Sequence, residues 1–313
     1  MEEKEEIKKS HELYLYYWII PVFIGLVLIN YFANILKLET FDIDLMVSIV
    51  TFLFGFFITI SFSMILARVG TLKISLAEET GRLVSLFSLS KHLGKKFSES
   101  LGEIIDKYTV KTLRYYSNYD LSRDEVNEIY SICSLMELKS ELQKQMSASF
   151  FYVLGEFEPT REKLEYLTKG RLIPAMKIVN YLLATILIIL LFLNRGDTLS
   201  NFIFIVLSTS VIFILLIIED YEDLRIGDYI NNISNSEQLF DLVGKERYYP
   251  EKLVGRVKLE NGRKYRIGVY NPKTKEEKMF LITYNKNFHI NFKNVLTKVL
   301  GRKKAEEIKI PEA

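Results

Sequence analysis

The sequence predicts an all-α membrane protein with four transmembrane helices, long cytoplasmic helical extensions, and a small C-terminal β-meander followed by a helix. Two charge-free runs carry the membrane prediction. Leu45 to Ala67 spans 23 residues without a charge and Phe202 to Ile218 spans 17, whereas Lys and Glu are dense elsewhere in the 313-residue chain. About 20 apolar residues suffice for a helix to cross the ~30 Å hydrocarbon core of a bilayer. A basic, strand-like segment near the C-terminus predicts the small sheet.

The composition excludes several other classes of protein. Hydrophobic residues make up 49% of the chain and charged residues 26%, which excludes a disordered or collagen-like polymer. Cys133 is the single cysteine and cannot form an internal disulfide, and the three histidines (His11, His92 and His289) lie too far apart for a local metal motif. We therefore expect no cofactor and no metal centre.

The four predicted spans form two hairpins. Leu13 to Leu36 is uncharged, and only eight residues separate it from the run Leu45 to Ala67. Pro174 to Leu193 pairs in the same way with Phe202 to Ile218 through a short loop. The N-terminal flank MEEKEE is acidic, and no A-x-A cleavage site follows, so the first run is expected to be a span and not a signal peptide.

The distribution of Lys and Arg predicts the orientation. Three lie before the first span, sixteen lie from Arg68 to Arg171 and nineteen follow Ile218, against only Lys37 and Arg195 in the hairpin loops. Because cytoplasmic segments hold an excess of basic residues, we expect a multi-pass protein of the cell membrane with both termini and the middle region in the cytoplasm.

These boundaries divide the chain into six predicted segments. They are a cytoplasmic N-terminus (1–12), a first transmembrane hairpin (13–67), a cytoplasmic helical insert (68–172), a second transmembrane hairpin (173–218), an acidic segment that ends in YYP (219–252), and a basic β-module with a C-terminal helix (253–313).

Helical periodicity dominates the insert. Leucines at helical spacing, from Leu72 to Leu93, predict that the second span continues as an amphipathic helix. Ser122 and Glu125 form a capping box that predicts a helix start. Pro159 predicts another start, from which a helix would run into the third span with a kink at Pro174.

The C-terminal segment contains three strand-like runs. Asn261-Gly262 indicates a tight hairpin and Asn271-Pro272 a longer turn, which predicts a three-stranded meander and then a helix from about Asn291. From Leu253 to Ile310 there are fifteen Lys and Arg against five Asp and Glu. This surplus suits contact with anionic lipid or a solvated basic face. No nucleic-acid-binding motif accompanies it, so no nucleic acid is expected as a partner.

The spans themselves contain no Asp, Glu, Arg or His. Pumps, antiporters and voltage sensors need ionisable groups inside the membrane, so these functions are disfavoured. The short catalytic and phosphate-binding motifs are also missing, and we do not expect an enzyme.

One face of the second span differs from the rest of that helix. At 100° per residue, six positions fall within an arc of about 100°. They are Ser48, Phe52, Gly55, Phe56, Thr59 and Ser63. One interpretation is close helix packing through small and hydroxyl residues. The other is a pore wall, in which hydroxyls wet the wider parts and Phe rings form a constriction that gates by dewetting. A pore would require several copies of the chain around an axis.

The string FLFGFFIT, Phe52 to Thr59, resembles the F-x-x-G-F-x-x-T stretch in the second span of bestrophin chloride channels. The plan of two spans, a helical insert, two spans and a tail is also similar. AEETGR (Ala77 to Arg82), the acidic run from Glu219 and the YYP string at Tyr248 to Pro250 resemble the bestrophin-like four-span family of bacteria and archaea.

The resemblance implies a homo-oligomeric ion channel, a pentamer, with a hydrophobic neck on the second span. Phe52 and Phe56 would form the constriction, and Ser48, Gly55, Thr59 and Ser63 the lining. Met64-Ile65-Leu66 stands where bestrophins have Arg-Trp-Trp, and their Pro-Phe-Gly after the fourth span is missing. These departures put the family's calcium clasp and gating in doubt.

Two further expectations remain open. Glu219, Asp220, Glu222 and Asp223 form an acidic run that could bind a cation, although a solvated or salt-bridged helix end is the favoured explanation. The alternative to the channel is a non-conducting membrane scaffold or sensor that recruits a cytoplasmic partner.

Overall fold

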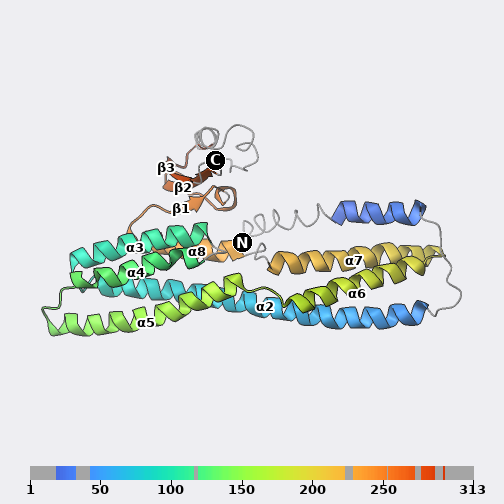
Figure 1. Ribbon diagram of the computed structural model, residues 1–313. Coiled ribbons are helices and arrows are strands. Elements are labelled where there is room, and N and C mark those ends of the chain that lie inside the picture. Colours follow the sequence, from blue (N-terminus) through green and yellow to red (C-terminus); the bar gives the residue numbers. More distant parts are fainter. Residues whose placement is uncertain are drawn as a thin grey trace. The chain divides into compact units, whose positions relative to one another are not determined.

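The computed structural model describes residues 19–32, 43–115, 119–222, 228–251, 253–271, 276–285 and 292. The chain divides into two compact units (Figure 1). The first unit contains residues 1–71 and 170–228, and the second contains residues 72–169 and 229–313. The boundary falls inside the helix α2 (Ile43–Ser90), so one helix contributes to both units.

Apolar helices make up the first unit. They are the helix Ile19–Phe32, the first half of α2, α6 (Pro174–Leu193) and α7 (Thr198–Glu222). In the part of the chain that the structure describes, three helices are long and apolar enough to cross a membrane, and they carry the second, third and fourth predicted spans. The first predicted span is described only over Ile19–Phe32, which is shorter, and its other residues lie outside the described ranges.

A narrow seam holds these helices together. α2 buries Phe54, Ile58 and Ile65. α6 buries Ala184, Leu187 and Leu191, and α7 buries Phe204, Val211 and Ile218. Recurrence at three and four residues places each set on one side of its helix. The remaining sides carry large apolar side chains that are exposed, which is compatible with a lipid environment.

The predicted helix from Pro159 into the third span is wrong at both ends. α5 (Glu141–Lys169) begins eighteen residues before Pro159, which lies inside the helix at an exposed position. The helix then stops at Lys169, and α6 begins at Pro174. Proline is favoured in the first turn of a helix because its missing N–H has no intrahelical partner there, so Pro174 starts a helix instead of kinking one.

The second unit is built in the opposite way, because its large apolar side chains are buried in a common core. Its helices are the second half of α2, α3 (Lys95–Arg114), α4 (Arg123–Ser131), α5 and α8 (Asp228–Val243). Leu83 and Leu86 of α2 pack with Phe97 and Leu101 of α3 and with Phe150 of α5. The predicted continuation of the second span is therefore present, because α2 runs unbroken to Ser90 and buries its leucine stripe.

The helix predicted from the capping box begins where expected, but the capping hydrogen bond is not formed. Ser122 precedes α4 and also ends the short 3-10 helix η1 (Tyr119–Ser122). Its hydroxyl donates back to the Tyr119 carbonyl at 2.7 Å instead of accepting from the α4 backbone.

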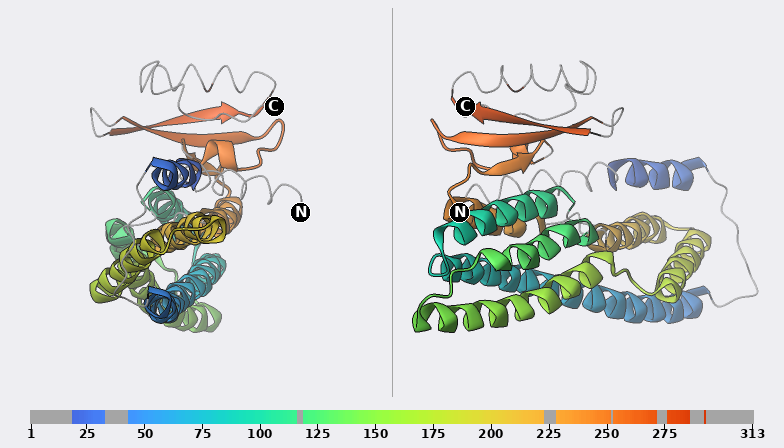
Figure 2. Two further views of the ribbon diagram at one scale, coloured as in Figure 1. Left: turned by 90° about the vertical axis from the view of Figure 1, so that its right-hand side faces the viewer. Right: turned by 60° about the vertical axis from the view of Figure 1, so that its left-hand side comes forward.

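The three-stranded sheet has the order β1-β2-β3. β1 (Tyr248–Pro250) pairs parallel to β2 (Lys264–Asn271), and β2 pairs antiparallel to β3 (Glu276–Thr283); both pairings can be followed in Figure 2.

The predicted meander is therefore wrong in its first strand. The YYP string takes that place, and the segment after Leu253 forms a 3-10 turn and a connection. Gly262 lies in a turn before β2 with a φ of 82°, a backbone conformation that glycine adopts without strain. The helix predicted from Asn291 lies outside the described residues, apart from Phe292.

Candidate functional site

The six positions predicted to form one side of the second span lie together on a solvent-accessible side of α2. We call Ser48, Phe52, Gly55, Phe56, Thr59 and Ser63 the Phe–hydroxyl face. Phe52 is 73% exposed and Phe56 is 54% exposed. Ser48, Thr59 and Ser63 are exposed and Gly55 is partly exposed. Within the first unit, no described helix covers this face.

The opposite side of α2 contacts other helices of the first unit. Phe54, Ile58, Ser61 and Ile65 are all buried. Asn180 of α6 donates from Nδ2 to Ser61 Oγ at 2.7 Å, a buried polar contact between the two helices. Small and hydroxyl residues therefore serve helix packing at Ser61, but the Phe–hydroxyl face points away from that contact.

The hydroxyls on the exposed face hydrogen-bond to their own helix. Thr59 Oγ1 donates to the Gly55 carbonyl at 2.7 Å, and Ser48 Oγ donates to the Asp44 carbonyl at 2.9 Å. A hydroxyl that donates to the preceding turn keeps its oxygen lone pairs available. The face consequently presents hydrogen-bond acceptors next to apolar rings.

Two carboxylates of the acidic run at the end of α7 are paired with a lysine of α6. Lys177 Nζ lies 2.7 Å from Glu222 Oε2 and 3.3 Å from Glu219 Oε1. Tyr181 donates from its hydroxyl to Glu219 Oε1 at 2.5 Å. Glu219 and Glu222 of the run are therefore salt-bridged within the first unit.

Glu222 is held most firmly in this cluster. Its side chain is 1% exposed, and its Oε1 accepts the Leu172 backbone N–H at 3.2 Å. Arg68 donates to the Glu222 carbonyl at 3.1 Å. Asp220 is buried, and Asp223 lies outside the described residues. Among the residues searched in the described ranges, no group of three or more His, Cys, Asp or Glu could hold a metal ion.

Sequence reasoning missed the partners of these carboxylates. Neither Tyr181 nor Asn180 was given a role from the sequence. The hairpin itself supplies a signal, because two antiparallel helices joined by a short loop bring the start of α6 beside the end of α7. Lys177 and Tyr181 lie one turn apart on α6, which places both opposite Glu219.

Arg195 lies in the loop between α6 and α7, but its side chain is buried and does not face solvent. Its Nε donates to the Phe192 carbonyl at 2.8 Å, and one terminal nitrogen lies 3.3 Å from the Asn30 carbonyl. The guanidinium also lies 3.8 Å from the centre of the Phe192 ring. These carbonyls belong to the C-terminal ends of helices, where the helix dipole favours a positive charge. Arg195 thus joins the ends of two helices in the first unit.

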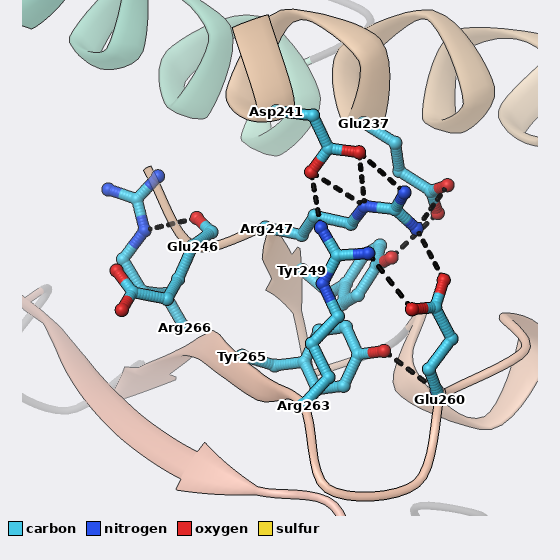
Figure 3. A network of polar contacts seen from close by, with 9 residues as sticks. All are labelled: Glu237, Asp241, Glu246, Arg247, Tyr249, Glu260, Arg263, Tyr265 and Arg266. Carbon is cyan, nitrogen blue, oxygen red and sulfur yellow. Dashed lines mark hydrogen bonds and ion pairs between the residues drawn. The ribbon is translucent and has the colours of Figure 1, made fainter. Parts of the chain in front are cut away.

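Three arginines are neutralised within the second unit: Arg263 and Arg266 of the predicted basic β-module and Arg247 just before it. Figure 3 shows the network around Arg247 and Arg263. Arg247 pairs with Asp241 at 2.6 Å and with Glu237 at 2.9 Å, and Arg263 pairs with Glu260 at 3.0 Å and also with Asp241. Arg266 forms two parallel bonds to Asp106 at 2.7 and 2.5 Å. These described arginines fix α8 and α3 to the sheet, so they contribute little free charge to a lipid surface.

Comparison with known proteins adds no relative. No family model, no curated protein and no solved structure matches the chain.

Proposed function

We propose that the chain is a subunit of a homo-oligomeric membrane channel that conducts ions passively along the Phe–hydroxyl face of α2. Phe52 and Phe56 would form the hydrophobic constriction, with Ser48, Gly55, Thr59 and Ser63 as the lining. The observation that carries the proposal is the division of α2 into two sides. One side contacts other helices of the first unit, and the other combines hydroxyls, a glycine and two rings that are mostly exposed.

The positions of the charges support a passive path. Among the described residues of the first unit, Arg68, Lys177, Glu219 and Glu222 at one end and Arg195 at the hairpin loop are engaged in ion pairs or backbone contacts. Between these ends the face is uncharged. A path without ionisable groups suits conduction controlled by wetting and dewetting of a constriction, and it does not suit proton-coupled transport.

An oligomer is part of the proposal because one subunit cannot surround an axis with a single helix face. Copies related by rotation would each contribute the same α2 face. The bestrophin resemblance suggests five copies. A protein that is strictly monomeric in detergent and in lipid would contradict the proposal.

Ion flux tests the constriction. Full-length protein in liposomes is compared with Phe52→Ala and Phe56→Ala, and we expect each variant to raise flux about tenfold, because removing a ring lowers the cost of wetting. Phe202→Ala is the matched control, since Phe202 is an exposed ring on α7. Equal effects at all three positions, or silence of all the proteins, would favour the scaffold.

Cysteine accessibility distinguishes a water-lined face from a lipid-facing one. Cys133 is the single native cysteine, so Cys133→Ser gives a background without thiols. In it, Ser63→Cys should react with a charged, membrane-impermeant thiol reagent and lose flux. Ser61→Cys, two residues away on the buried side, should not react. An unreactive thiol at Ser63 in a conducting protein would move the path away from this face.

A further inference from the structure

Glu79 of the second unit is a buried carboxyl group that the proposed channel does not use. α2 carries two adjacent glutamates beyond the charge-free segment, and their surroundings differ completely. Glu78 is exposed, whereas Glu79 is 5% exposed and lies in the interior of the unit. A buried carboxylate is costly unless it is paired or hydrogen-bonded, so its neighbours determine its state.

Two phenol groups from different elements donate to Glu79. The Tyr108 hydroxyl of α3 donates to Oε1 in a short hydrogen bond, and the Tyr119 hydroxyl of η1 lies 3.3 Å from Oε2. Tyr108 and Tyr119 are both almost completely buried. The carboxyl group therefore links α2, α3 and η1 at a single point.

The charged groups around this point do not form an ion pair with Glu79. Arg161 of α5 is buried; it donates to the Tyr119 carbonyl at 2.8 Å and forms an ion pair with Glu165 at 3.7 Å. Glu165 is shared with Lys169 and Arg123, and Glu125 of α4 is paired with Lys111. Among the described residues, Glu79 has phenols but no ammonium or guanidinium partner.

This environment favours the neutral carboxyl group. Removal from water raises the pKa of Glu79 from 4.5 to about 7, although the two phenols and the charge of Arg161 act in the opposite direction. Because the pKa is higher in the packed state than in a hydrated one, the packed state binds the proton more tightly. Packing is thus most stable below about pH 4.5 and loses stability as the pH rises through about 7.

We propose that Glu79 is a proton-dependent contact that controls how firmly α3 and η1 pack on α2. With the proton bound, the buried Glu79 side chain carries no charge and the three elements stay packed. Without it, opening of the cluster to water becomes easier, because hydration stabilises the carboxylate. This inference concerns the second unit and does not depend on ion conduction.

Hydrogen exchange of the full-length protein in detergent, measured from about pH 5 to about pH 8 and corrected for the intrinsic rate, tests the proposal. In the wild type, protection in α3 and η1 should fall on the order of fiftyfold over this range. Glu79→Gln, which keeps the shape but cannot ionise, should show nearly constant protection. Glu78→Gln is the matched control and should follow the wild type.

A Glu79→Gln protein with the wild-type pH profile would overturn the inference, as would loss of the profile in Glu78→Gln. If Glu79→Gln does not fold, Tyr119→Phe is the second variant. It removes one hydrogen bond to the carboxylate, so the loss of protection should move to higher pH. An unchanged midpoint, or a move to lower pH, would also contradict the role of Glu79.

Discussion

The two units of the chain place their large apolar side chains in opposite ways. In the first unit, Phe202 of α7 and Phe52 of α2 are mostly exposed, and burial is confined to a narrow seam between helices. In the second unit, Phe97 and Phe150 are fully buried, and the surface carries ion pairs such as Lys107 with Glu128. The same rule, that apolar groups avoid water, produces both patterns if the first unit is surrounded by lipid and the second by water.

Two buried polar contacts, one in each unit, differ in their chemistry. The seam of the first unit contains a neutral amide–hydroxyl contact between Asn180 and Ser61, whereas the second unit buries a carboxyl group at Glu79. An amide needs only a hydrogen-bond partner, while a carboxyl can also change its charge. The Asn180–Ser61 contact therefore contributes specificity of packing, and the proposed role of Glu79 adds sensitivity to pH.

The largest expected effect concerns the core of the second unit. Phe150→Ala should lower the free energy of unfolding by about 3–5 kcal/mol, because the ring is fully buried and packs edge-on against Phe97 at 5.3 Å. Phe151→Ala, at the exposed neighbouring position, should cost under about 1 kcal/mol. Denaturant unfolding of the full-length protein in detergent measures both. Equal losses would mean that Phe150 does not contribute to a packed core of the second unit.

A smaller effect is expected at the seam of the first unit. Asn180→Ala and Ser61→Ala, combined in a double-mutant cycle, should show a coupling of about 1 kcal/mol, typical of hydrogen bonds between membrane helices. Thermal unfolding in one lipid or detergent provides the values. Strict additivity of the two substitutions would indicate that the contact does not stabilise the seam.

The smallest effect concerns the ion-pair network of the second unit. Hydrogen bonds from Arg247, with the charge of Arg263 nearby, hold the pKa of Asp241 below its ordinary value of 3.8. A lowered pKa contributes stability that is present above the ordinary value and is lost as the pH falls through the folded one. Asp241→Asn should flatten the acid side of the stability profile in calorimetry. Glu99→Gln, at an exposed helical pair, is the control and should leave that side unchanged.

Local patterns predicted part of the fold well. Three of the predicted apolar spans correspond to α2, α6 and α7. The leucine stripe correctly extends α2 to Ser90, because hydrophobic periodicity directly reflects which side of a helix is buried. The turn residues between them correctly predicted that the segments of β2 and β3 pair as antiparallel strands. The first strand was wrong because β1 pairs parallel to β2 across a connection, and a parallel pairing leaves no turn signal in the sequence.

The candidate site shows the same limit. The spacing of Phe52, Phe56 and Thr59 predicted a shared helix face, but only the folded unit showed that α2 makes its own contacts through Phe54 and Ser61 on the other side. Spacing assigns residues to a face of a helix, and it cannot say which face meets a neighbour. Lys177 as the partner of Glu219 and Glu222 likewise required the antiparallel packing of α6 and α7.

The sequence by itself determined where the apolar helices lie, because helix length and the absence of charge are local properties that need no partner. The tertiary structure decided which charges are neutralised and which carboxyl group is buried. Those outcomes depend on side chains far apart in the chain meeting in space, as Glu79 meets Tyr108 and Tyr119, and the free energy of a charge is set by the water that these neighbours exclude.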